Sequence, residues 1–301
     1  MSYKLGSLPS PRASRSENAD FMEVMCLLSE QGSYSAVEAA QALGIAADEE
    51  DDRVAAELPF YDVLSVIEER EKATAGKYPF VSDGYSVQLN QDVPDQFKEL
   101  YIFLLLATRN DMSRTRIIDG IDGGKLFEQL CVKVLKSYFG DKCNCFVFGT
   151  GDDEHRTFDD KLNHLISQLK EPKYAIRRPE GDTHHQVDDK LDLVAHIPFQ
   201  DKRMGQFIAF AQCKTGDSWY DSIRLLSPQD FSENHFTPPL NFTPIRVYMV
   251  SESFSNDWES RSRGVVFFDR CRLMRFMPDT IADEQLMGNI ITWNHGVVQG
   301  L

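Results

Sequence analysis

The sequence predicts an α/β protein in which a mixed central sheet flanked by helices follows an acidic, helical N-terminal region. Its 301 residues are 42% hydrophobic and 11% aromatic, enough to build a buried core. After residue 119 the patterns alternate between helix and strand, which is typical of one central sheet. We divide the chain into a flexible tail (1–16), a helical region (17–118) and an α/β domain (119–301).

The first hundred residues carry the acidity. They hold 19 acidic and 8 basic side chains, against 28 and 24 in the rest of the chain. Serines and prolines at positions 7–16 predict the tail. Apolar residues at helical spacing predict the helices that follow, at residues 21–28, 35–43, 58–66 and 97–107.

The second half alternates between the two kinds of element. Glycines at 120, 123 and 124 precede an amphipathic helix at 125–138, which Gly140 ends. The remaining patterns predict helices at 158–169, 228–236 and 255–263, and strands at 145–148, 190–197, 206–214, 246–250, 265–268 and 273–276.

Composition excludes several classes of protein. The longest apolar run, near residues 101–107, is far shorter than the roughly 20 residues of a membrane span, and the first 30 residues lack the apolar core of a signal peptide. We therefore expect a cytoplasmic protein without a membrane partner, whose six cysteines are reduced. Cys143 and Cys145 form a close pair, but no second pair follows at zinc-finger spacing. A net charge of −15 excludes binding to DNA through overall charge.

Polar side chains interrupt two predicted strands that are joined at hairpin spacing. Asp192 enters the first strand, where an unpaired carboxylate is costly to bury. The second ends in Gln212-Cys213-Lys214, so Gln212 and Lys214 share a face and Cys213 points to the other. Antiparallel pairing would bring Asp192 beside both. Glu128 lies at the edge of the apolar stripe of the preceding helix and can face the sheet.

Glu128, Asp192, Gln212 and Lys214 together resemble the PD-(D/E)xK, or restriction-endonuclease-like, nuclease superfamily. The resemblance covers about residues 120–276 and is strongest to the Mrr-like branch, in which Gln commonly replaces the acidic residue before x-Lys. It implies a nuclease domain at 119–301 that cleaves DNA, in restriction or another form of anti-phage defence. Because glutamine is neutral, the number of bound ions, one or two, stays open.

The resemblance also implies the chemistry. Asp192, Gln212 and the Cys213 backbone carbonyl would bind Mg²⁺, or Mn²⁺ in its place, and Glu128 would bind a second ion or orient water. Lys214 would position the attacking water and stabilise charge on the phosphate. Cleavage of a duplex would require two sites, so we expect a homo-oligomer or a complex with a partner protein such as an NTPase.

Other interpretations of these residues stay open. Asp192 and Lys214 fit a simple cross-strand ion pair, and Glu128 an ordinary surface carboxylate. The whole domain fits a catalytically silent interaction subunit, or a nuclease acting on RNA. Lys173, Arg177 and Arg178 are candidate phosphate contacts. Further candidates are the stacking pair Trp219 and Tyr220, and a basic C-terminal segment that could line a substrate cleft, with arginines at 261, 263, 270, 272 and 275.

Overall fold

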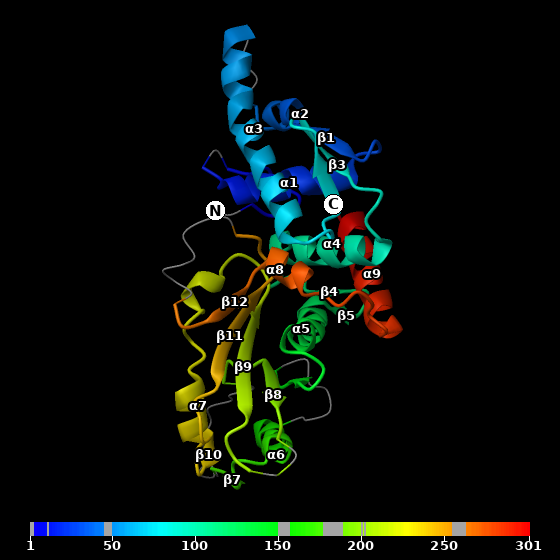
Figure 1. Ribbon diagram of the computed structural model, residues 1–301. Coiled ribbons are helices and arrows are strands. Elements are labelled where there is room, and N and C mark those ends of the chain that lie inside the picture. The colour runs from blue at the N-terminus through cyan, green and yellow to red at the C-terminus, as the bar shows by residue number, and fades with distance from the viewer. Residues whose placement is uncertain are drawn as a thin grey trace.

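A five-stranded mixed sheet forms the centre of the C-terminal part of the computed structural model (Figure 1). The structure describes residues 3–10, 12–44, 50–149, 157–176, 189–199, 201, 203–254 and 263–301. The strand order is β12–β11–β9–β8–β6, with β8 antiparallel to both neighbours and β9, β11 and β12 mutually parallel. The strands are β6 (Asn144–Val147), β8 (Leu193–Ile197), β9 (Phe207–Lys214), β11 (Ile245–Val250) and β12 (Val266–Phe268). The predicted mixed α/β class is confirmed.

Helices cover both faces of this sheet. α5 (Gly123–Phe139) packs its apolar stripe on one face, where Leu193 and Ala209 belong to the same buried cluster as Leu130. α6 (Phe158–Leu169) and α7 (Pro228–His235) pack on the other face. Alternate side chains of β9 therefore enter two different apolar layers, as a strand of period two requires.

The N-terminal unit contains a second, small sheet. Its elements are α1 (Arg15–Leu28), β1 (Ser33–Ser35), α2 (Ala36–Ala42), α3 (Glu50–Ala73), β2 (Phe80–Ser82) and β3 (Ser86–Leu89). The strands pair antiparallel in the order β1–β3–β2. Ser14 and Ser35 begin α1 and α2 with capping boxes. On α3, Asp62, Glu68 and Glu69 are exposed, so this surface presents carboxylates rather than a basic face for phosphates.

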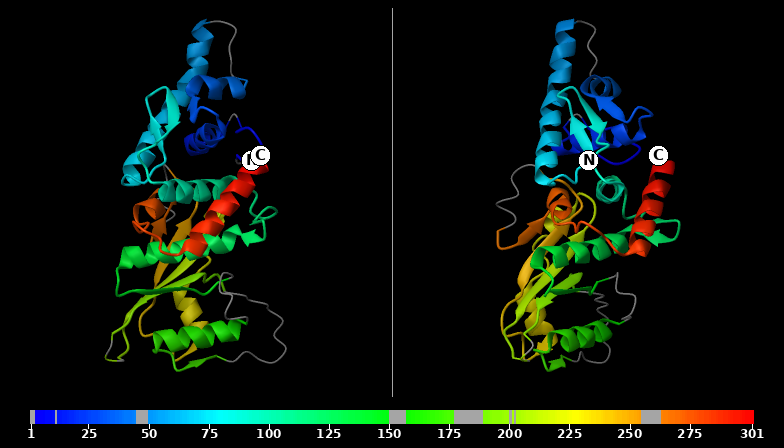
Figure 2. Two further views of the ribbon diagram at one scale, coloured as in Figure 1. Left: turned by 90° about the vertical axis from the view of Figure 1, so that its right-hand side faces the viewer. Right: turned by 45° about the vertical axis from the view of Figure 1, so that its right-hand side comes forward.

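Three helices join the N-terminal unit to the sheet (Figures 1 and 2). They are α4 (Asp95–Arg109), α8 (Arg270–Arg275) and α9 (Glu284–Gln299). One apolar cluster runs from Tyr3 through α4 and α9 to the face of the sheet under α5. The two halves of the chain therefore share a continuous core. Two short strand pairs lie at its margins. One is the hairpin of β4 (Ile117–Ile118) and β5 (Ile121–Asp122), and the other pairs β7 (Tyr174–Ala175) with β10 (Phe236–Thr237), which are distant in sequence.

The structure corrects several sequence-based expectations. Residues 3–10 are not a free tail, because Tyr3 is buried against Phe21 and Lys4 pairs with Asp217. The region 17–118 is not purely helical, since three strands interrupt it. Residues 273–276 belong to α8 and the turn after it rather than to a strand, because Asp269 caps a helix there. Most of the helix expected at 255–263 lies outside the described residues.

Among the helices that the structure describes, none combines the length and the apolarity that crossing a membrane requires.

Candidate active site

Asp192 is fixed between the ends of three strands. β8 begins at Leu193, three residues later than the sequence predicts, and Leu193 pairs with Ala211. Asp192 directly precedes this pair and Gln212 directly follows it, so the two residues lie at the same end of the sheet. The Asp192 backbone N–H donates to the Ala211 carbonyl at 3.0 Å, and its carbonyl accepts from the N–H groups of Phe148 and Gly149 at 2.7 and 2.9 Å. Backbone contacts on both sides thus hold the carboxylate in place.

The Asp192 side chain reaches β9. Its Oδ2 accepts a hydrogen bond of 2.7 Å from the backbone N–H of Cys213, the residue between Gln212 and Lys214. Asp192 is only 7% exposed. A charge-assisted bond of this kind stabilises a buried carboxylate and orients its other oxygen away from the strand.

Glu128 meets Asp192 at Gly149, the residue that follows the end of β6. A Cβ placed on Gly149 would lie 3.0 Å from Asp192 Oδ1 and 3.3 Å from Glu128 Oε2. Both carboxylates therefore border the same small space, which only a residue without a side chain leaves open. Glu128 is 7% exposed on α5, so it is not the ordinary surface carboxylate of the alternative interpretation.

Gln212 is the most deeply buried member of the group, with no exposed surface. Within the described part of the chain, neither its Oε1 nor its Nε2 has a hydrogen-bond partner. Buried amides nearly always bond to a protein group, a water or an ion, because leaving them unpaired costs free energy. Both hydrogen-bonding atoms of the Gln212 amide are therefore without a protein partner in the described part of the chain, at the end of the sheet where Asp192 lies.

Lys214 is the last residue of β9 and is partly buried. Strand alternation places it on the same face of the sheet as Gln212. The cross-strand ion pair of Asp192 with Lys214 stays an alternative interpretation of these two strand ends. The Lys214 carbonyl accepts a hydrogen bond of 3.2 Å from the Ser251 N–H, which ties the strand end to β11.

Cys213 points to the opposite face and is 8% exposed. Burial, the Cys131 thiol and the carboxylates of Asp192 and Glu128 raise the pKa of the Cys213 thiol well above its usual value. A thiol with a raised pKa is a poor nucleophile, so this side chain contributes packing.

The geometry fits a divalent cation that prefers oxygen ligands. Two carboxylates border the space at Gly149, and the neighbouring strand β9 carries an amide without a protein partner among the described residues. Carboxylate and amide oxygens are donors that Mg²⁺ and Mn²⁺ accept. Among the described residues, no group of three or more His, Cys, Asp and Glu side chains is arranged to hold a metal ion.

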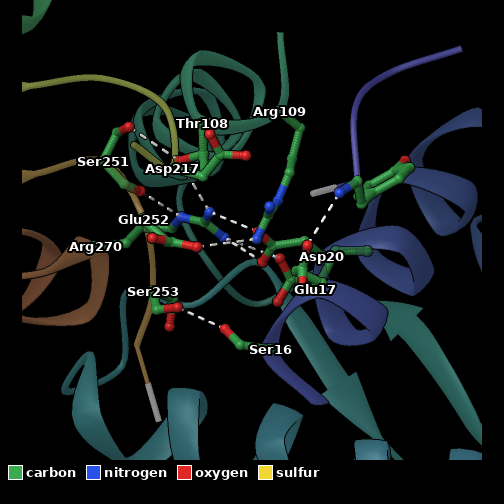
Figure 3. Close-up of polar contacts among 12 residues, drawn as sticks. Ser16, Glu17, Asp20, Thr108, Arg109, Asp217, Ser251, Glu252, Ser253 and Arg270 are labelled. Atoms are coloured by element: carbon green, nitrogen blue, oxygen red, sulfur yellow. Dashed lines mark hydrogen bonds and ion pairs between the residues drawn. The ribbon is translucent and has the colours of Figure 1, made fainter. Parts of the chain in front are cut away.

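A buried ionic network lies behind the strand ends (Figure 3). Arg270 of α8 donates to both carboxylate oxygens of Asp20 of α1, at 2.8 and 3.0 Å, and Arg109 of α4 donates to Asp20 at 2.6 Å. All three have no exposed surface. Burial alone would raise the pKa of Asp20, but the guanidinium groups of Arg270, Arg109 and Arg70 lower it well below its usual range. The basic C-terminal segment suggested that Arg270 could line a substrate cleft. Because Arg270 is buried in this network, it does not.

The network connects directly to the candidate site. Arg270 Nε donates to the Ser251 carbonyl at 2.9 Å, and the Thr108 hydroxyl donates to the Ser251 hydroxyl at 3.0 Å (Figure 3). Ser251 in turn holds the Lys214 carbonyl. The N-terminal unit is thus linked through three hydrogen bonds or ion pairs to the end of β9.

The predicted nucleic-acid contacts are only partly described. Lys173 is exposed beside β7, whereas Arg177 and Arg178 lie outside the described residues. Trp219 is 1% exposed, stacks on Tyr220 at 4.1 Å and donates to Glu252, so the Trp219 ring belongs to the core and does not stack on a base.

Sequence reasoning missed two residues at this site. Gly149 permits the carboxylates to approach, and Lys161 of α6, only 4% exposed, donates to the Gly149 carbonyl at 2.6 Å. A signal for Lys161 exists: it follows Phe158 at helical spacing and precedes Leu162 and Leu165, so it borders the apolar stripe of α6.

Comparison with known proteins finds no match: no family model, no curated protein and no solved structure is significantly similar to this chain.

Proposed function

We propose that this protein is a metal-dependent nuclease that hydrolyses phosphodiester bonds in DNA. One observation carries the proposal: two buried carboxylates border the same space at Gly149, and the neighbouring strand β9 ends in a buried amide without a protein partner among the described residues and in a lysine. Carboxylate, amide and ammonium groups at one strand end are suited to holding a divalent cation and a phosphate together.

The order of elements supports a restriction-endonuclease-like core. α5 precedes three strands, β6, β8 and β9, and α7 leads to β11, which is parallel to β9. Glu128 lies on the first helix, Asp192 just before the second strand, and Gln212-Cys213-Lys214 at the end of the third. These are the places that the PD-(D/E)xK resemblance assigns to the helix Glu, the Asp and the (D/E)-x-K motif, with Gln in the Mrr-like position.

The residues divide the chemistry among them. Mg²⁺ or Mn²⁺, held by Asp192, Gln212, the Cys213 carbonyl and Glu128, would supply a Lewis acid that neutralises phosphate charge and acidifies water. Asp192 is oriented for this by the Cys213 N–H. The Lys214 ammonium would orient the attacking water and stabilise the negative charge that grows on the phosphate oxygens. Glu128 would orient water or hold a second ion.

Charge makes a partner part of the proposal. The net charge of −15 and the carboxylates on α3 repel the phosphates of a DNA backbone. Local contacts such as Lys173 therefore need further DNA contacts from a partner. We infer a cytoplasmic homo-oligomer, or a complex with a partner protein such as an NTPase, acting in restriction or anti-phage defence. Two copies would supply the two sites that cleavage of both strands needs.

The test compares cleavage of matched DNA and RNA. Purified protein is incubated with plasmid, labelled single-stranded DNA and labelled RNA, each with Mg²⁺, Mn²⁺ or a chelator. We expect metal-dependent cleavage of DNA, with Lys214→Ala lowering the rate at least about 100-fold. Lys142→Ala, an exposed lysine remote from the cluster, is the control and should cleave like the wild type.

Two other results would replace the proposal. Cleavage of RNA but not of DNA would make the protein an RNA nuclease. No cleavage with any metal, together with a stable complex with an NTPase partner, would make it a silent nuclease-fold subunit.

A further inference from the structure

A polar cavity of about 340 Å³ opens at the far end of the sheet from the carboxylates. Its lining residues come mainly from the C-terminal end of α6 and from the β8–β9 hairpin, elements that lie toward the bottom of Figure 1. Its volume falls in the range of small-molecule sites. The residues that line this cavity include Asn144, Gln168, Lys170, His196, Phe199 and Arg203.

His196 lines this cavity, and Gln206 holds its ring in one tautomer. Gln206 Nε2 donates to the Leu169 carbonyl, which turns Gln206 Oε1 toward His196 Nδ1 at 2.9 Å. Because an amide oxygen can only accept, Nδ1 carries the proton and Nε2 has a lone pair. The imidazole is 2% exposed, and among the described residues Nε2 has no partner. Burial and the nearby Lys170 charge lower the pKa of His196, although the bond to Gln206 opposes them, so the ring is neutral.

Cations stand at the cavity mouth. Lys170 ends α6 in a left-handed conformation that places it at the rim, close enough to His196 to affect its titration. Arg203 is exposed on the hairpin, 3.8 Å from Asp201, so its guanidinium is only loosely paired. Two cations and a single imidazole disfavour a metal ion and favour an anion.

The remaining walls suit a planar, hydrogen-bonding group. Phe199 is 60% exposed and offers a ring face, and the Asn144 and Gln168 amides can both donate and accept. A ligand that satisfies all these groups needs an N–H donor for His196, a flat surface for Phe199 and an anionic group for Lys170 and Arg203. A nucleobase with a phosphate has all three features.

We propose that this cavity binds a nucleoside monophosphate, with the edge of the base donating to His196 Nε2 and the phosphate between Lys170 and Arg203. The site is separate from the carboxylate cluster, since His196 and Asp192 lie at opposite ends of β8. Binding of a nucleotide in this cavity therefore does not depend on whether the carboxylate cluster hydrolyses phosphodiesters.

The test is isothermal titration calorimetry of the full chain with each of the four nucleoside 5′-monophosphates, beside ribose 5-phosphate and inorganic phosphate. We expect at least one nucleotide to bind with a Kd below about 1 mM and at least about tenfold more tightly than ribose 5-phosphate. A phosphorylated DNA oligonucleotide that displaces the nucleotide would assign the site to a strand end, and no displacement would assign it to the free nucleotide.

Variants separate the two halves of the ligand. His196→Asn keeps a donor for Gln206 but removes the Nε2 acceptor, and should weaken nucleotide binding at least about tenfold without affecting ribose 5-phosphate. Arg203→Ala, at an exposed position that does not threaten folding, should weaken both ligands, whereas Lys142→Ala should change neither. Equal affinity for nucleotide and ribose 5-phosphate, or unchanged nucleotide binding by Arg203→Ala, would overturn the proposal.

Discussion

Glu252 should make the stability of this protein fall as the pH rises. It follows β11 at the edge of the ionic network, is 7% exposed, accepts a hydrogen bond of 2.6 Å from Trp219 Nε1 and lies 3.5 Å from Arg109 Nη2. Burial raises the pKa of Glu252 from 4.5 to about 7, although Arg109 and the Trp219 hydrogen bond act in the opposite direction. The folded protein therefore keeps this proton over a range of pH in which the unfolded chain has released it.

The sign and size of the effect follow from linkage. A raised pKa means that the stabilising contribution is complete below pH 4.5 and is lost as the pH rises to about 7. Each pH unit in that interval costs about 1.4 kcal/mol, so the whole interval costs about 3 kcal/mol. Between about pH 5.5 and pH 8, this effect should lower the free energy of unfolding by about 2 kcal/mol.

Glu252→Gln isolates this contribution, because glutamine still accepts from Trp219 but does not titrate. The free energy of unfolding of both proteins is measured by urea denaturation from about pH 5.5 to pH 8. We expect the variant to gain about 2 kcal/mol on the wild type across that range, whichever is more stable at the start. A difference between the two proteins that stays constant with pH would refute the reasoning.

Three further substitutions test the network and the candidate site. Arg270→Met leaves Asp20 without its bidentate partner and should lower the free energy of unfolding by about 3–5 kcal/mol in urea, with exposed Lys142→Met as an unaffected control; a loss below about 1 kcal/mol would contradict this. Gly149→Ala places a methyl group 3.0 Å from Asp192 and should lower metal-dependent DNA cleavage at least about tenfold, in a protein that still folds cooperatively. Full activity of this variant would show that the two carboxylates do not need the space at Gly149. Lys161→Met removes the donor to the Gly149 carbonyl and should raise the Mg²⁺ concentration needed for half-maximal cleavage, and Lys161→Arg should bring that concentration back to the wild-type value. The same Mg²⁺ dependence in all three proteins would show that Lys161 does not support the site.

The sequence predicted those elements whose signals are local. The range predicted for α6 agrees with the structure because Thr157 and Asp160 form a capping box and an apolar stripe follows. The antiparallel β8–β9 pair follows from two apolar runs joined at hairpin spacing. From that pairing alone, Asp192 could be placed at the same end of the sheet as Gln212.

Features that depend on distant parts of the chain could not be predicted in this way. Arg270 is 250 positions from Asp20, so a basic segment that looked exposed is buried by its partner. Gly149 carries no side-chain pattern, and its role follows only from the close approach of Glu128 and Asp192. The sheet of the N-terminal unit consists of strands of three and four residues, too short for alternation to distinguish from loops.

The site and the network together suggest why the N-terminal unit accompanies the α/β domain. Asp20 on α1 holds Arg270, Arg270 holds the Ser251 carbonyl, and Ser251 holds the Lys214 carbonyl. The packing of α1 is therefore connected through hydrogen bonds and ion pairs to the strand end that carries Lys214. Hydrogen bonds in a buried network of this kind strengthen one another.

Diffraction from a crystal soaked in Mn²⁺ can establish the proposed metal site by itself, because anomalous scattering locates the ion without any assay of activity. We expect an anomalous peak within coordination distance of Asp192, with the Gln212 side-chain oxygen as a second ligand, and no such peak in crystals of Asp192→Asn. A fully soaked crystal with no ion at Asp192 and Gln212 would show that this metal site does not exist.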